Sequence, residues 1–155
     1  MMKAKKFKVT QEGFDKLNSE FKELREVKRP VVVARLQKAR EMGDLSENSE
    51  YTSAKESLRF IDSRIVWIEL RLRNAEVVAK DANNNFVSLG DFVVLEKDGQ
   101  KLEYQIVGEL EADIENKKLS TNSPIGKAVL GKGKGDEVQV ATPSGNVVYK
   151  IINIS

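Results

Sequence analysis

The sequence contains no cysteine and no histidine among its 155 residues. Without these residues the chain can form no disulfide, no Ser-His-Asp triad, no thiolate nucleophile and no zinc site of His and Cys ligands. Any proton-transferring group must then be a carboxylate, an amine or a hydroxyl. No apolar run reaches the roughly 20 residues that span a bilayer, and no apolar segment follows the basic start of the chain. We therefore expect a cytoplasmic protein without a membrane partner.

Charged side chains are abundant, at 32% of the residues, although the formal net charge is only +2. Residues 25–40 contain six basic residues and one acid, and residues 41–54 then contain four acids and no base. This distribution predicts a basic shaft that ends in an acidic tip. The bases and acids of such a shaft can equally be solvated faces or interhelical ion pairs.

A stripe of apolar residues recurs at alternating steps of three and four at Tyr51, Ala54, Leu58, Ile61, Ile65, Ile68, Leu72 and Ala75. A stripe this narrow is typical of a coiled-coil seam, and it needs an apolar partner. The partner begins after Thr10, a candidate N-cap, and has the same spacing at Phe14, Leu17, Phe21 and Leu24.

The register of the first stripe changes near Pro30, where Val27 and the run 31–33 take over before Leu36 and Ala39 resume the pattern. Because proline removes a helical hydrogen bond and clashes with the preceding turn, we expect a kink there rather than a break. The helix should continue to about Met42. The connection that follows is short, so the two helices must be antiparallel.

After about residue 78 the apolar period changes to two. Residues 80–86 read as a linker, and two apolar runs, Phe92 to Leu95 and Leu102 to Val107, flank an Asp98-Gly99 turn. Such a turn between alternating runs predicts a β-hairpin. Ser123-Pro124 predicts the start of a short helix that stops at Gly131, and two further strands surround the turn Pro143-Ser144-Gly145.

The chain is thus predicted to be an α+β protein with two domains. Residues 1–78 form an antiparallel coiled-coil hairpin with an acidic tip at 43–51, and residues 79–155 form a small α+β domain with a mainly antiparallel sheet.

Two interpretations apply to the tip acids Asp44 and Glu47. Their spacing matches a capping box, in which Asp44 would cap the second helix and Glu47 would reach back to the N–H of the cap. Alternatively, Mg²⁺ is commonly held by one or two carboxylates together with phosphates and waters. Two acids on a long projection then form an incomplete metal site, which another macromolecule with a phosphodiester to be cut would complete. Arg35, Lys38 and Arg40 behind the tip could contact its phosphates.

Matching motifs occur in order along nearly the whole chain: Thr10-Gln11-Glu12-Gly13, Lys16-Leu17, Arg29-Pro30, Ala39-Arg40 before GDLSENSEY, Glu111-Ala112-Asp113, Ser123 to Ala128, Gly131, Gly135-Asp136 and Pro143-Ser144-Gly145. Together they resemble the Gre family of bacterial transcript cleavage factors. The resemblance implies an N-terminal antiparallel coiled coil and a C-terminal domain with an FKBP-like fold. It also implies a factor without its own active site, which stimulates the Mg²⁺-dependent hydrolysis of backtracked RNA by RNA polymerase and so rescues arrested complexes.

In that family the C-terminal domain docks at the rim of the polymerase's secondary channel, and the coiled coil enters the channel towards the 3′ end of the nascent RNA. The resemblance assigns Asp44 and Glu47 to catalysis and to a Mg²⁺ ion held jointly with the polymerase, with none bound by the chain alone. It places Arg40 and Lys55 near the RNA or the active site, although members often have Arg at the latter position.

Ser123 and Pro124 fall in the segment that the resemblance associates with polymerase docking, and they also suit an ordinary helix start. We expect the free protein to be a monomer. An alternative is a regulator that occupies the channel and inhibits the polymerase without cleavage, and the presence of both Asp44 and Glu47 argues against it.

Overall fold

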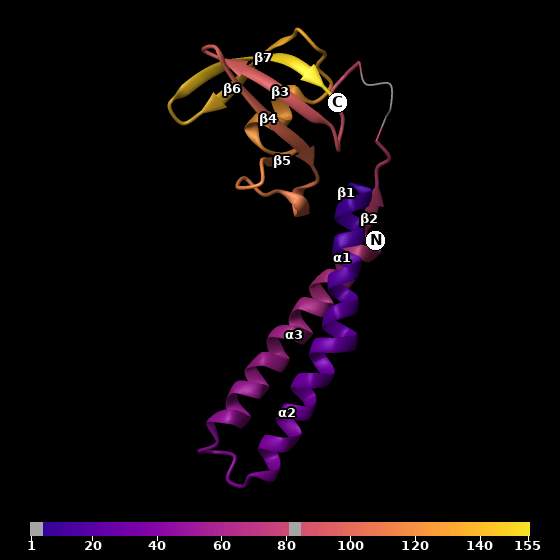
Figure 1. The fold of residues 1–155 in the computed structure, drawn as a ribbon, viewed down its shortest axis with the longest axis vertical. Helices are drawn as coiled ribbons and strands as arrows, with labels where there is room; N and C mark the ends of the chain where they lie inside the picture. Colours follow the sequence, from indigo (N-terminus) through magenta and orange to yellow (C-terminus); the bar gives the residue numbers. More distant parts are fainter. Residues whose placement is uncertain (1–4, 81–84) are drawn as a thin grey trace. The chain divides into compact units, whose positions relative to one another are not determined.

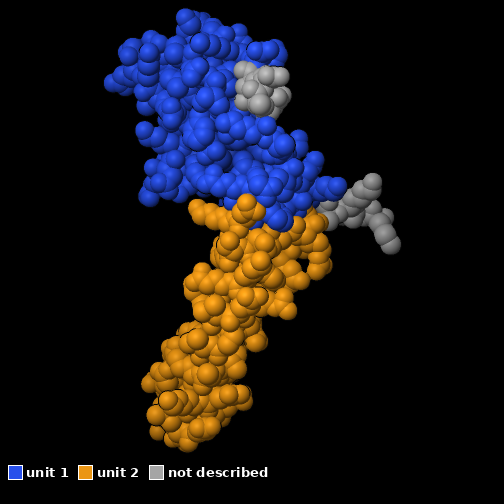
Figure 2. Space-filling model, turned by 45° about the vertical axis from the view of Figure 1, so that its right-hand side comes forward, with its two compact units in different colours: residues 1–14, 75–155 blue, residues 15–74 orange. Residues whose placement is uncertain are grey.

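The computed structural model describes residues 5–80 and 85–155, and the chain divides into two compact units (Figure 2). One unit is Asp15–Asn74, and the other combines Met1–Phe14 with Ala75–Ser155. The first residues therefore group with the second half of the chain, whereas the sequence suggested a division after residue 78. The linker predicted at 80–86 lies partly outside the described residues.

The unit Asp15–Asn74 is a helical hairpin (Figure 1). Its first arm comprises α1 (Gln11–Glu23), the π-helical turn η1 (Leu24–Lys28) and α2 (Arg29–Glu41), and its second arm is α3 (Ser49–Arg73). Buried and partly buried side chains form one seam: Leu17, Phe21, Leu24, Val32, Leu58, Ile61, Ile65, Trp67, Ile68 and Leu72. Because most of these positions belong to the predicted stripes, the hairpin is confirmed.

Pro30 is the second residue of α2, with Arg29 between it and the end of the π-helical turn. The Arg29 N–H donates to the carbonyl of Leu24, five residues earlier, where an α-helix would use the carbonyl four residues earlier. In an α-helix the proline ring would clash with a carbonyl of the preceding turn. The wider turn gives the ring room, and the arm continues through Pro30 without a break, as the sequence predicts.

The same turn resets the register of the buried stripe. Leu24 and Val32 are both buried, 6% and 9% exposed, although a regular seam repeats every seven residues and these two are eight apart. The π-helical turn absorbs the extra residue. The expectation that Val27 and Val31 take over the stripe is wrong, because they are 58% and 63% exposed and line a surface groove with Phe60.

A two-stranded parallel sheet was not predicted. It pairs β1 (Phe7–Val9) with β2 (Ala75–Val77), and Val9 is fully buried. Ala75 therefore belongs to a strand and does not end the helical stripe. Strands of three residues are too short for an alternating pattern to show in the sequence.

The second unit also contains a five-stranded sheet in the order β5-β4-β3-β7-β6. Its neighbouring strands are antiparallel except for the pair of β4 and β5. The strands are β3 (Phe92–Lys97), β4 (Gln100–Val107), β5 (Lys118–Ser120), β6 (Glu137–Thr142) and β7 (Gly145–Ile154). The mainly antiparallel sheet is thus confirmed, and β5 is an addition to the predicted strands.

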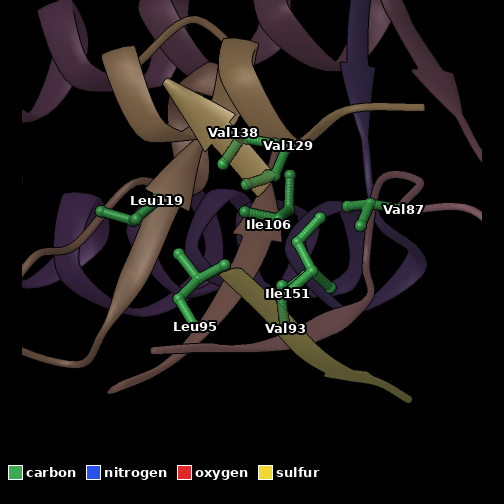
Figure 3. Close-up of a cluster of buried hydrophobic side chains, with 8 residues drawn as sticks. All are labelled: Val87, Val93, Leu95, Ile106, Leu119, Val129, Val138 and Ile151. Carbon is green, nitrogen blue, oxygen red and sulfur yellow. The ribbon is translucent and has the colours of Figure 1, made fainter. Parts of the chain in front are cut away.

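Aliphatic side chains from the sheet, from α4 (Pro124–Val129) and from the segment before β3 form the core of this unit (Figure 3). Its buried members are Val87, Val93, Leu95, Ile106, Leu119, Val129, Val138 and Ile151. The predicted turn between β3 and β4 is present, with φ of 51° at Asp98 and 78° at Gly99. Positive φ at both residues is the requirement that makes Asp-Gly suitable for a two-residue hairpin turn.

Glu111, in the 3₁₀ turn η2 (Glu109–Glu111), holds the start of α1. Its carboxylate accepts from the Thr10 N–H at 3.0 Å, from the Thr10 hydroxyl, and from the Gly108 N–H at 3.2 Å. Thr10 caps α1 as predicted, because its Oγ1 accepts from the Gly13 N–H at 3.0 Å. A Cβ at Gly13 would overlap the Glu111 carboxylate. Two motifs that are 101 residues apart thus meet in one contact.

We predict that Gly13→Ala destabilises the protein by roughly 1–3 kcal/mol, because the added methyl overpacks against Glu111. In a Glu111→Ala background the same change should cost little or stabilise, since alanine is the better helix former. Urea unfolding of the four proteins measures this coupling.

Glu111→Gln is the matched control, because it keeps the volume of the side chain and should keep the penalty of Gly13→Ala. An equal penalty in the Glu111→Ala background would contradict the proposed overlap.

Candidate functional site

The tip of the hairpin is the loop of residues 42–48 between α2 and α3 (Figure 1). Met42 is the C-cap of α2, and its N–H donates to the carbonyl of Ala39 at 3.2 Å. Gly43 follows with φ of 113°, a value that side chains rarely adopt. The predicted end of the first arm near Met42 is therefore confirmed, and the chain turns at Gly43.

The N-cap of α3 is Asn48. Its Oδ1 accepts from the N–H of Tyr51 at 3.1 Å. Its Nδ2 donates to the carbonyl of Ala39 at 2.7 Å, which joins the start of α3 to the end of α2. The capping box predicted for Asp44 and Glu47 is therefore wrong, because the helix begins at Ser49 and Asn48 performs the capping.

Asp44 makes a local turn instead. Its Oδ1 accepts from the Ser46 N–H at 3.0 Å and from the Ser46 hydroxyl at 2.8 Å. The backbone hydrogen bond first, and the hydroxyl second, lower the pKa of Asp44 below its ordinary value. Bonds to the charged form favour ionisation, so Asp44 is a carboxylate throughout the neutral range.

Glu47 is exposed on the same loop. Within the described part of the chain, its carboxylate has no hydrogen bond or ion pair. Glu50, by contrast, forms an ion pair with Arg35 at 2.5 Å. Asp44 and Glu47 are thus the tip acids that neither cap α3 nor form an ion pair.

The donor set at the tip suits part of a Mg²⁺ site. Among residues 5–80 and 85–155, no group of three or more Asp, Glu, His or Cys side chains could hold a metal ion. Asp44 and Glu47 supply two carboxylates, the number that Mg²⁺ usually takes from a protein when phosphates and waters provide the rest. Asp44 and Glu47 therefore fit as two of the ligands of such an ion.

Arg40 and Lys55, the predicted contacts for RNA, both lie near the ring of Tyr51. The Arg40 guanidinium carbon and the Lys55 Nζ are each 5.9 Å from the ring centroid, at the outer limit of a cation–π contact. Both side chains are exposed. The sequence pattern predicts Tyr51 only as a seam residue, although its spacing of four residues from Lys55 also indicates a shared helical face.

The other basic residues behind the tip differ in whether their charged groups are already bound within the hairpin. Arg35 binds Glu50 and also donates to the Ser53 hydroxyl at 3.1 Å, so its guanidinium is engaged within the hairpin. Lys38 is exposed. The prediction that Arg35 contacts phosphates therefore loses support, whereas Lys38 and Arg40 keep exposed charges.

Ser123 and Pro124 belong to the other compact unit. The Ser123 Oγ accepts from the Gly126 N–H at 3.0 Å and donates to the Ser120 carbonyl at 2.6 Å, and Pro124 is the first residue of α4. The predicted N-cap is confirmed. Because the Ser123 hydroxyl is occupied, Pro124 is the better candidate for an external contact.

Within the described residues, no helix is long and apolar enough to cross a membrane. Two family models match the chain. The model described as "Transcription elongation factor, N-terminal" matches residues 7–77, and the one described as "Transcription elongation factor, GreA/GreB, C-term" matches residues 82–155.

The chain resembles curated relatives over its whole length. It is 47% identical over 158 residues to "Transcription elongation factor GreA" of Bacillus licheniformis, with 100% of each chain covered. It is 48% identical over 157 residues to the protein of the same name from Staphylococcus aureus strain JH9, with 99% of each covered. A solved structure, GreA factor homolog 1 (Gfh1) of Thermus thermophilus, is 29% identical, with 97% of this chain and 99% of that one covered and a TM-score of 0.46.

We predict that Ser46→Ala raises the pKa of Asp44 only part of the way to its ordinary value of about 3.9, because the backbone hydrogen bond, the larger cause of the lowered pKa, stays. Any stability from these bonds is present above the ordinary pKa and is lost as the pH falls through the lowered one. NMR titration of the carboxyl carbon measures the shift, with Ser49→Ala as the control. An unchanged midpoint in Ser46→Ala would contradict the hydroxyl contribution.

Proposed function

The chain belongs to the GreA/GreB family of transcription elongation factors, and on that premise we propose that it binds RNA polymerase and stimulates the polymerase's own cleavage of backtracked RNA. Its sequence motifs match GreA rather than GreB, and the curated relatives carry the name GreA. In this proposal the hairpin enters the secondary channel and arrested complexes resume elongation. The hydrolytic activity belongs to the polymerase.

The observation that carries the proposal is the way the polar side chains at the tip are used. Asn48 caps α3, so Asp44 and Glu47 are not needed to satisfy the first turn of the helix. Glu50 is held by Arg35. Two carboxylates therefore remain at the end of a long hairpin without a role in its own helical structure, and this supports a role in another molecule's site.

Asp44 and Glu47 would hold a Mg²⁺ ion jointly with the polymerase and orient the attacking water. When bound, the ion lowers the pKa of the water and stabilises charge on the phosphodiester. Carboxylate oxygens are ligands that Mg²⁺ takes from proteins, and the tip supplies two such groups. The low pKa of Asp44 suits it to be a ligand, because its ionised form is already favoured before an ion arrives.

Arg40 and Lys55 would hold the phosphates near the 3′ end of the nascent RNA. They come from opposite arms of the hairpin and both lie close to the Tyr51 ring. Exposed cations beside an acidic tip provide attraction for the RNA backbone while the acids face the ion. The charges of this small region thus match a phosphodiester with bound Mg²⁺.

The sheet-containing unit would dock at the rim of the channel through the start of α4, with Pro124 as the exposed candidate. We propose that one copy of the chain acts on one polymerase. Pro124→Ala should weaken the competition of the variant with the unmodified protein for polymerase, because it removes the proposed docking side chain. The fold should be kept, since alanine is tolerated at a helix start and the Ser123 cap stays in place. Unchanged competition would remove Pro124 from the docking surface.

The test of the catalytic proposal is Asp44→Asn combined with Glu47→Gln, assayed on a stalled, backtracked elongation complex. The amide oxygen that replaces the Asp44 carboxylate would still accept from Ser46, and Asn48 still caps α3, so the fold should be retained. The rate of RNA cleavage should fall by about 100-fold or more, as expected when a residue that activates water is lost. Competition with the unmodified protein for the polymerase should be unaffected.

The matched control is Glu41→Gln with Glu56→Gln, which removes two exposed charges from the same hairpin and should keep cleavage. If the tip variant stimulated cleavage as well as the unmodified protein, the catalytic assignment would be wrong. If the unmodified protein slowed elongation without any cleavage, the chain would be an inhibitor.

A further inference from the structure

We propose that Asn48 is a positioning residue for cleavage, which fixes Asp44 and Glu47 by closing the tip loop with its side-chain amide. The inference rests on the proposed function, in which these two acids act at the polymerase. It adds a residue that contacts neither RNA nor metal and that acts through the geometry of the loop.

The amide of Asn48 makes two hydrogen bonds that point in different directions. Its oxygen accepts from the Tyr51 N–H at 3.1 Å, within the first turn of α3. Its nitrogen donates to the Ala39 carbonyl at 2.7 Å, in the last turn of α2. One planar group thus connects both helices at the two ends of the loop that carries the acids.

The carbonyl that receives this bond lies at a helix end. The last carbonyls of an α-helix lack partners within the helix, and they need a donor from elsewhere. The Ala39 carbonyl accepts from the Met42 N–H at 3.2 Å and from Asn48. The Asn48 amide therefore satisfies the end of one arm and the start of the other together.

Small residues near the bond from Asn48 to Ala39 allow α2 and α3 to lie close together there. Ala39 is 1% exposed and Ala54 is fully buried, so small side chains face the partner helix at the tip. Larger residues there would separate the arms beyond the reach of an asparagine. The bond from Asn48 to Ala39 therefore depends on small residues in the seam near the tip.

The loop has little else to hold it. Gly43 has no atom within 4 Å of the place where a Cβ would lie, and residues 41–47 are all exposed. Besides the Met42 cap, the loop is held internally by the bonds from Ser46 to Asp44. Without the bridge from Asn48 to Ala39, the side-chain bonds that join the arms next to the loop would be the exposed ones from Arg35 to Glu50 and Ser53, and residues 43–47 would sample more conformations.

The discriminating substitution is Asn48→Ser. Serine is as good an N-cap as asparagine, so the bond with the Tyr51 N–H is kept. Its hydroxyl is too short to cap α3 and reach Ala39 as well. Asn48→Asp is a second variant, which keeps the cap and replaces the donor by an acceptor. Both should fold, because neither removes a buried apolar side chain.

Asn74→Ser is the matched control. The Asn74 Nδ2 donates to the Leu70 carbonyl at 2.9 Å, the same type of bond at the other end of the same helix. This change removes an amide-to-carbonyl bond of equal chemistry and leaves the tip untouched. Effects seen with Asn48→Ser and absent from Asn74→Ser are therefore specific to the tip.

Two measurements test the proposal. In the cleavage assay, Asn48→Ser should lower the maximal rate by about 10- to 100-fold, as expected for slight misplacement of reacting groups, while the concentration that gives half-maximal stimulation stays the same. In the free protein, ¹⁵N relaxation should show greater motion on the picosecond-to-nanosecond timescale for residues 43–47, with α3 unchanged.

Stimulation by Asn48→Ser at the unmodified rate would overturn the proposal, and so would a tip as rigid as in the unmodified protein. The relaxation measurement needs no polymerase. If the unmodified protein failed to stimulate cleavage, the proposed function would fall, whereas relaxation would still decide whether Asn48 closes the loop.

Discussion

The seam between the two arms of the hairpin is the constraint on which the rest of this structure depends. Two helices have only one shared face in which to bury apolar side chains, so each irregularity in the sequence must be absorbed without losing that face. The π-helical turn before Pro30 does this, since it accommodates the proline and moves the buried stripe from Leu24 to Val32. Near the tip, Ala39 and Ala54 keep the arms close.

The close approach of the arms explains how the tip can present its charges. Asn48 reaches across to Ala39 and caps α3 with the same amide. Asp44 and Glu47 are therefore not needed to cap α3, which is the role that their spacing in the sequence predicts. The chain then offers two carboxylates on a loop held at both ends, as the proposed Mg²⁺ site shared with the polymerase needs.

Local patterns predicted much of this fold, and contacts between distant residues account for what they missed. The seam and the turn at Asp98 could be read from spacing and from turn chemistry. The sequence could not predict that Asn48 rather than Asp44 caps α3, because both residue types cap equally well. The bond from Asn48 to the Ala39 carbonyl of α2 decides between them. The bond from Thr10 to Glu111 joins residues 101 positions apart, which no local period reveals.

The proposed function depends on the hairpin bringing two carboxylates to a Mg²⁺ ion in the polymerase. The most direct test is the Mg²⁺ concentration that half-saturates RNA cleavage in a stalled complex, measured with the unmodified protein, with the Asp44→Asn and Glu47→Gln variant, and with neither. We expect the unmodified protein to lower this concentration and the variant to leave it at the value of polymerase alone. Equal half-saturating concentrations in all three cases would contradict a shared ion.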